Sequence, residues 1–145
     1  MSDIIIRLAT PADFDAIYDF VCDLENERFN KELLKPCYEI CLIGEYNHYL
    51  VAMVNERAIG YISCHGQVLM HHGGLVYEIQ ELYVVPEYRS KGVGALLIDA
   101  LMKIINQKNF VLLEVSSNVK RKDAHRFYES NGFLHTSYKF KKGQA

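Results

Sequence analysis

The chain has 145 residues, half of them apolar, and a formal net charge of −2. This length and apolar content suit one domain, 1–145, with a substantial core. The small net charge argues against a general nucleic-acid-binding protein, which usually carries a strongly basic face. No apolar run approaches the roughly 18 residues of a membrane span, and the four cysteines form no C-x-x-C pair. We therefore expect a cytoplasmic protein that binds neither membranes nor nucleic acid.

The N-terminal part of the chain predicts a strand followed by two helices. Residues 4–9 are mostly β-branched or apolar and favour a strand. Thr10 and Pro11 then form a typical helix start, and apolar residues recur at helical spacing over 14–24. Residues 33–43 favour a second helix. These helices precede the main part of the predicted sheet.

The middle of the chain predicts most of the sheet. Because the first two runs are separated by a hairpin-length gap, we expect three consecutive antiparallel strands, at residues 49–54, 58–64 and 75–85. The continuous apolar stripe over 93–105 predicts a helix. A short buried strand at 110–115 follows that helix, and a crossover of this length predicts that it lies parallel to the strand before the helix.

The C-terminal part predicts one more helix and one more strand. Residues 122–131 favour a helix that stops at Gly132, and 133–140 favour the last strand. The sequence thus predicts a mixed α/β (α+β) fold.

The most informative segment is the glycine-rich turn Arg89-Ser90-Lys91-Gly92-Val93-Gly94, which lies between a predicted strand and a predicted helix. Its two glycines leave backbone N–H groups accessible at the positive end of a helix, where anions bind. The segment contains neither a P-loop nor a G-x-G-x-x-G pattern. We therefore expect a phosphate-binding turn of another kind.

With the later segment Phe127-Tyr128-Glu129-Ser130-Asn131-Gly132-Phe133, this turn resembles the GCN5-related N-acetyltransferase (GNAT) family over nearly the whole chain. The turn fits that family's R/Q-x-x-G-x-G/A pattern. Residues 77–82 and 117–128 also resemble the bacterial aminoalkylphosphonate N-acetyltransferases within that family. The resemblance implies a mixed sheet of six to seven strands flanked by about four helices, and transfer of an acetyl group from acetyl-CoA to the primary amine of a small molecule.

The resemblance also implies where acetyl-CoA binds. Its pyrophosphate would meet the backbone amides of the turn, and its pantetheine arm and thioester would meet the amides of the preceding strand, which act as an oxyanion hole. Asn118 matches a cofactor-contacting position, although an asparagine there is equally a helix N-cap. The expected cofactor-binding residues are Leu82, Tyr83, Val84, Arg89, Ser90, Lys91, Gly92, Val93, Gly94, Asn118, Ala124 and Phe127.

Three side chains are expected to handle protons. By resemblance, Tyr128 protonates the departing CoA thiolate; its alternative role is that of a core tyrosine before a helix end. Glu81 or Glu78 would remove the proton of the attacking amine, unless water does. Residues three apart on a strand point to opposite faces unless a bulge changes the register, so we expect only one glutamate at the substrate and favour Glu81.

His71 and His72, with His65 and Glu78 on adjoining strand segments, form a candidate divalent-metal site, although adjacent histidines on a loop are more often solvated. A charge run is usually a solvated helix face. We expect that for at least two of Lys120, Arg121, Lys122 and Arg126.

Two other functions remain open on sequence grounds: a non-catalytic acyl-CoA sensor, which would not need Tyr128, and a protein or peptide N-acetyltransferase. An exposed sheet edge and the family pattern favour a homodimer.

Overall fold

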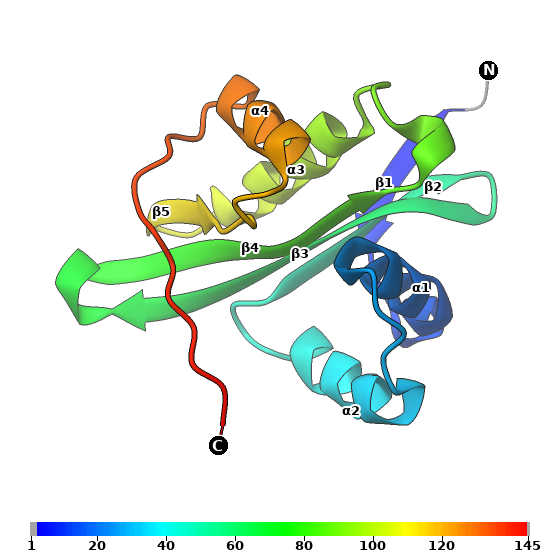
Figure 1. The fold of residues 1–145 in the computed structure, drawn as a ribbon, viewed down its shortest axis with the longest axis horizontal. Helices are drawn as coiled ribbons and strands as arrows, with labels where there is room; N and C mark the ends of the chain where they lie inside the picture. Colours follow the sequence, from blue (N-terminus) through cyan, green and yellow to red (C-terminus); the bar gives the residue numbers. More distant parts are fainter. Residues whose placement is uncertain (1–2, 145) are drawn as a thin grey trace.

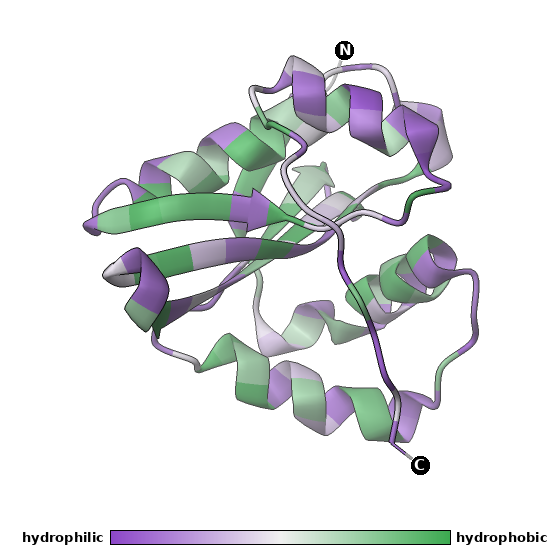
Figure 2. Ribbon diagram, turned by 60° about the vertical axis from the view of Figure 1, so that its left-hand side comes forward, coloured by the Kyte–Doolittle hydropathy of each residue, from purple (hydrophilic) through white to green (hydrophobic). Residues whose placement is uncertain are grey.

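The computed structural model describes residues 3–144 and places a β-sheet between two layers of helices (Figures 1 and 2). Strand order follows chain order. The first three junctions are antiparallel and the last is parallel. The predicted mixed sheet is confirmed, with five strands in the described residues instead of the expected six to seven: β1 (Ile4–Leu8), β2 (His48–Val54), β3 (Arg57–Leu69), β4 (Gly74–Val84) and β5 (Phe110–Val115).

The strand expected at 133–140 is wrong. The described chain after Phe133 is irregular, and the side chains of Leu134, Tyr138 and Phe140 are 85%, 78% and 92% exposed. The alternation of apolar and polar residues is suited to a strand, but a strand also needs a partner for its backbone, and none pairs with this segment. β5 is therefore the edge of the described sheet.

Two helices cover each face of the sheet. The helices α1 (Phe14–Glu25) and α2 (Lys31–Leu42) lie on one side, and α3 (Val93–Ile105) and α4 (Lys122–Ser130) on the other (Figure 1). The number of helices agrees with the sequence prediction. No helix within residues 3–144 is both long and apolar enough to cross a membrane.

The start of α1 is fixed by charge and by capping. The Asp13 carboxylate accepts a hydrogen bond from the Thr10 N–H at 2.7 Å and forms two bonds with the Arg7 guanidinium, at 2.8 and 2.9 Å. Arg7 lies on β1, so this ion pair attaches the helix start to the first strand. The hydrogen bond and charge of Arg7 lower the pKa of Asp13. The predicted strand-to-helix junction is confirmed.

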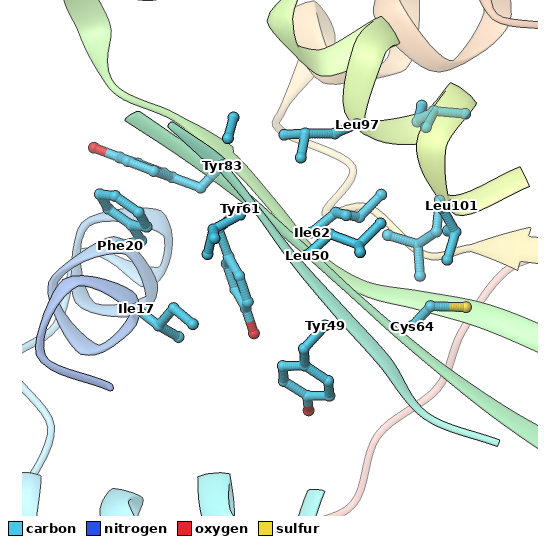
Figure 3. Close-up of a cluster of buried hydrophobic side chains, with 14 of the residues drawn as sticks. Ile17, Phe20, Tyr49, Leu50, Tyr61, Ile62, Cys64, Tyr83, Leu97 and Leu101 are labelled. Carbon is cyan, nitrogen blue, oxygen red and sulfur yellow. The ribbon is translucent and has the colours of Figure 1, made fainter. Parts of the chain in front are cut away.

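Each face of the sheet has its own core (Figure 3). Tyr49, Tyr61 and Tyr83 point to the face that α1 and α2 cover. The Tyr83 ring stacks on Phe20 of α1 at a centroid distance of 5.1 Å, and the Tyr49 ring lies 6.0 Å from that of Tyr38 of α2. On the opposite face, Leu97 and Leu101 of α3 pack over aliphatic side chains of β2 and β3. The α1 face thus has hydroxyl groups within a buried layer, whereas the α3 face is almost wholly apolar.

Candidate active site

The site begins at a bulge in β4. Ser63 of β3 faces Glu81, and the next residue, Cys64, faces Ile79, so Gln80 is an extra residue in β4. A bulge of this kind shifts by one residue the alternation of side chains along the strand. Glu81 and Glu78 then lie opposite Ser63 and His65, which are two apart on β3 and share one face of the sheet.

The expectation that Glu78 and Glu81 point to opposite faces of the sheet is therefore wrong. Both lie on the α1 face of the sheet because the extra residue moves Glu78 to that side. Glu81 Oε1 accepts a 2.8 Å hydrogen bond from the Tyr61 hydroxyl and a second bond from Ser63 Oγ. Glu78 Oε2 accepts a 3.1 Å hydrogen bond from Ser116 Oγ, just after β5. The carboxylates are thus oriented by neighbours on both sides of β4.

β4 and β5 part directly at this bulge. Their parallel pairing ends at Ile79 and Val115, while β4 continues to Val84 along β3 (Figure 1). Within residues 3–144, the edge of β4 that faces β5 has no strand beside it beyond Ile79. We call this divergence of the two strands the opening; main-chain polar groups of β4 lie along one side of it.

The direction of the free amides follows from strand geometry. The Val85 N–H donates to the Ile59 carbonyl of β3 at 2.9 Å. Because successive N–H groups of a strand point to opposite edges, those of Leu82 and Val84 point into the opening, and that of Tyr83 points toward β3. Only two of the three expected amides are therefore available to a ligand there.

The glycine-rich turn continues from this open edge. Ser90 and Gly92 adopt positive φ angles of 62° and 83°, and Gly92 is the N-cap of α3. No side chain caps the helix at this position, and the first-turn amides of α3 have no partner within the helix. Arg89 folds back over the turn: its Nε donates to the Val84 carbonyl at 2.8 Å, and its guanidinium lies 5.4 Å from the centre of the Tyr83 ring. The turn thus combines free N–H groups with an exposed cation.

Gly94 allows α3 and α4 to pack closely against each other. A Cβ at this position would lie 2.8 Å from Phe127 Cζ of α4, closer than real contacts permit. The Phe127 ring packs in the space that the glycine leaves, and Tyr128 follows, with its ring 5.5 Å from that of Phe127. The second glycine of the motif therefore positions α4, the helix that carries Tyr128, against the first turn of α3.

Tyr128 is half-buried between Phe127 and Phe133, whose ring centre lies 5.8 Å away. Burial raises the pKa of Tyr128, and the positive charge of Arg121 partly opposes this shift. The phenol consequently stays protonated at neutral pH. Burial outweighs the effect of Arg121 on this pKa.

Asn118 is not the N-cap of α4, because that position is taken by Arg121. The Asn118 side chain instead accepts from the Lys120 N–H at 2.9 Å, within the turn that precedes the helix. Ala124 is half-buried on α4. All four cations of this region are exposed, as a solvated face predicts: Lys120, Arg121, Lys122 and Arg126.

Two hollows lie on the α1 side of the sheet. A larger one of about 400 Å³ lies between the end of α1 and Arg89 and includes Asp23, which accepts a 3.0 Å hydrogen bond from the Tyr83 hydroxyl. The second has a volume of about 240 Å³ and borders the bulge. It is lined by Asn47, His65, Gly66, Gln67, Val76, Glu78, Gln80 and Glu114. We call this second hollow the acidic pocket, since its lining contains two glutamates and no lysine or arginine.

The candidate metal site is not formed. No group of three or more histidine, cysteine, aspartate or glutamate side chains that could hold a metal ion occurs in residues 3–144. His71 and His72 lie together in the short 3₁₀ turn Met70–His72, at the tip of the hairpin between β3 and β4. β3 runs five residues further than its predicted end at Cys64, and this extension carries the tip away from the bulge.

The sequence model of the Acetyltransferase (GNAT) family matches residues 14–133. The chain belongs to this family. An aminoalkylphosphonate N-acetyltransferase of Salmonella typhimurium is 34% identical over 137 residues, which cover 94% of this chain and 89% of that protein. An uncharacterized N-acetyltransferase of Bacillus subtilis, YhdJ, is 29% identical over 94% of this chain and 95% of that protein.

Solved structures agree with the GNAT fold. The chain superposes on the aminoglycoside N-acetyltransferase AAC(6')-Iy in complex with CoA with a TM-score of 0.87, at 16% identity, covering 99% of this chain and 96% of that one. A transcriptional regulator from Bacillus halodurans gives a TM-score of 0.88 at 21% identity, with 98% and 100% covered. At these identities the likeness concerns the fold.

Several residues of the candidate site are not apparent from the sequence. Tyr61 and Ser63, which hold Glu81, read as ordinary members of a buried strand. Glu114 joins Glu78 in the acidic pocket because the two are register partners in the parallel pairing. Only the register of the sheet reveals these neighbours, and a single sequence does not give it.

The positive φ of Gly92 generates a prediction. Gly92→Ala adds a Cβ to a left-handed residue, which is strained, and it shifts the amides of the turn. We expect a loss of about 1 kcal/mol in the free energy of unfolding and an increase of about tenfold in the dissociation constant of CoA, measured by calorimetry.

Gly73→Ala is the matched control, because Gly73 also has a positive φ, 66°, but lies at the remote hairpin tip. It should lose similar stability and keep its CoA affinity. Equal CoA affinities of the two variants would contradict a role of the turn in binding.

Proposed function

We propose that the protein is an acetyl-CoA-dependent N-acetyltransferase that acts on the primary amine of a small molecule by direct attack on the thioester. The observation that carries this proposal is the parting of β4 and β5 beside the glycine-rich turn. The free amides of β4 are followed along the chain by the free amides at the start of α3. Acetyl-CoA has a thioester at one end and a pyrophosphate further along, so the first set can bind the thioester and the second the pyrophosphate.

The backbone supplies the stabilisation of charge in this proposal. Negative charge develops on the thioester oxygen as the amine attacks, and the N–H groups of Leu82 and Val84 are directed at the opening where it would lie. One well-placed donor of this kind contributes roughly 3 kcal/mol to the transition state. The amides from Ser90 to Gly94, with Arg89, hold the phosphates. Asn118, Ala124 and Phe127 border the cofactor from the α4 side.

Tyr128 is the proposed proton donor to the departing thiolate. A phenol with an ordinary pKa of about 10 gives its proton to a thiolate of about 8.5 at a cost of roughly 2 kcal/mol. The raised pKa of Tyr128 adds to this cost, but it also keeps the phenol protonated until the thiolate has formed.

The acidic pocket supports an amine substrate. Glu78 and Glu114 provide negative charge for an ammonium group before it is deprotonated. An aminoalkylphosphonate is the first substrate to test, because the Salmonella relative bears that name. A peptide substrate is the second candidate, since the larger hollow beside α1 offers room of about 400 Å³.

The assay for this proposal follows free thiol while the protein is incubated with acetyl-CoA and a panel of amines. The panel contains aminoalkylphosphonates, amino acids, polyamines, aminoglycosides and short peptides. We expect thiol release with at least one small amine, with the acetylated amine identified by mass spectrometry. Release with peptides alone would favour the peptide acetyltransferase, and CoA binding without release from any amine would favour the sensor.

Tyr128→Phe tests the proton donor. This substitution removes the hydroxyl and leaves the packing between Phe127 and Phe133 in place. We expect kcat to fall about 10- to 100-fold with little change in the CoA dissociation constant. The exposed Tyr138 offers a matched control, and Tyr138→Phe should leave kcat unchanged. Unchanged turnover of the Tyr128 variant would remove this assignment.

We further propose that the protein forms a homodimer. β5 presents an unpaired edge in the described sheet, with Val111 and Leu112 partly exposed, and the irregular segment after Phe133 exposes Leu134, Tyr138 and Phe140. Covering such apolar surface favours association.

Light scattering at micromolar concentrations should give a mass near twice the 16.7 kDa of one chain. Leu134→Lys with Phe140→Lys should reduce it to that of one chain. A monomeric wild-type protein would contradict the dimer.

A further inference from the structure

His65 occupies a position in the proposed site that its sequence context does not reveal. It lies on β3 opposite Glu78, two residues after Ser63, which faces Glu81 next to the bulge. The side chain is half-buried and lines the acidic pocket. Its ring is therefore close to the point where β4 and β5 part and where the proposed thioester would lie.

A buried phenol holds the His65 ring. Tyr49 Oη and His65 Nε2 are 2.7 Å apart, and the ring centres are 5.7 Å apart. Burial, reinforced by the neighbouring Cys41 side chain of α2, raises the pKa of Tyr49, so its hydroxyl remains neutral. In residues 3–144, no protein group forms a hydrogen bond with the other ring nitrogen, Nδ1. One nitrogen is thus fixed and the other is available to a ligand.

The competing carboxylates are partly engaged. Glu81 Oε1 accepts hydrogen bonds from Tyr61 and Ser63, and the two oxygens of Glu78 accept from Gln80 and Ser116. Each of these bonds stabilises the carboxylate as an anion and so lowers its basicity. An imidazole also has an ordinary pKa near 6.5, which is better matched to proton transfer at neutral pH than the pKa of a carboxylate near 4.3.

The electrostatic surroundings suit a base that is neutral before the reaction. Burial lowers the pKa of His65, while the nearby charges of Glu81 and Glu78 act in the opposite direction. The imidazole is therefore neutral at pH 7, and the same two carboxylates stabilise the imidazolium once it forms. The other titratable groups that face this ring are Tyr49 from β2 and, across the pocket, Glu114 from β5.

We propose that His65 is the general base that takes the proton of the attacking amine, with Tyr49 as its positioning residue. This inference rests on the proposed acetyl transfer. As the nitrogen–carbon bond forms, the N–H electron pair stays on the amine nitrogen and its proton passes to His65 Nδ1. The carbon–sulfur pair leaves with the thiolate, which takes a proton from Tyr128. His65 then gives its proton to water and Tyr128 regains one from water, which restores both groups. The step requires the tautomer in which Nε2 carries a proton throughout and donates to Tyr49 Oη.

The test is a pH profile of kcat with the amine found in the panel. Wild-type kcat should rise with an apparent pKa below 6.5 and then level off, because His65 must be unprotonated. His65→Gln retains a side-chain amide for Tyr49; we expect kcat to fall about 100-fold and the rise to disappear. The CoA dissociation constant should stay unchanged.

Two further variants separate catalysis from structure. Added imidazole should restore part of the activity of His65→Ala, which a purely structural role does not predict. Tyr49→Phe should lower kcat about tenfold and shift the apparent pKa of the kcat profile. The His65 imidazole remains in place in this variant but loses its hydrogen bond to Tyr49 Oη. His135→Gln, on the exposed C-terminal segment, is the matched control and should retain wild-type kcat.

The outcomes distinguish the two proposals. A wild-type protein that acetylates no amine contradicts the proposed function. An active wild type whose folded His65→Gln variant keeps its kcat and its rise with pH overturns only the role of His65. Thermal unfolding checks that the variants are folded. If His65→Gln does not fold, His65→Asn replaces it in the same test.

Discussion

One extra residue in β4 determines most of the site. Gln80 breaks the regular pairing with β3, and the parallel pairing with β5 ends next to it, at Ile79 and Val115. An internal strand would normally have both backbone edges occupied. Here the remaining part of β4 has one edge free, so amides that would otherwise stabilise the sheet can bind a ligand. The same shift places Glu78 and Glu81 on one face.

The two ends of the opening are supported differently. On the α3 side, Gly94 leaves the space that Phe127 fills, so the glycine-rich turn and the helix of Tyr128 form one unit. On the α1 side, Tyr61 and Ser63 hold Glu81, Tyr49 holds His65, and Tyr83 bonds to Asp23. This tyrosine-rich layer supplies hydroxyl groups inside a buried core, which fix polar side chains without exposing the core to water.

Local patterns predicted the parts of the fold that depend on nearby residues. The apolar stripe of α3 and the short run of β5 were predicted with the bounds that the structure has, 93–105 and 110–115. The turn at Arg89 to Gly94 also lies where expected. Features that depend on pairing between distant strands were missed: the extension of β3 to Leu69, the face of Glu78, and the unpaired state of residues 133–140. These depend on register, which neighbouring residues in the chain do not encode.

The central claim is that the opening between β4 and β5 and the adjoining turn form one binding site for acetyl-CoA. Backbone amide resonances of ¹⁵N-labelled protein, followed during titration with CoA, test it directly. We predict that the largest shifts occur at Leu82, Val84 and the amides from Ser90 to Gly94, with small shifts at the hairpin tip around Gly73. Binding that leaves Leu82 and Val84 unshifted, or that centres on the hairpin tip, would contradict it.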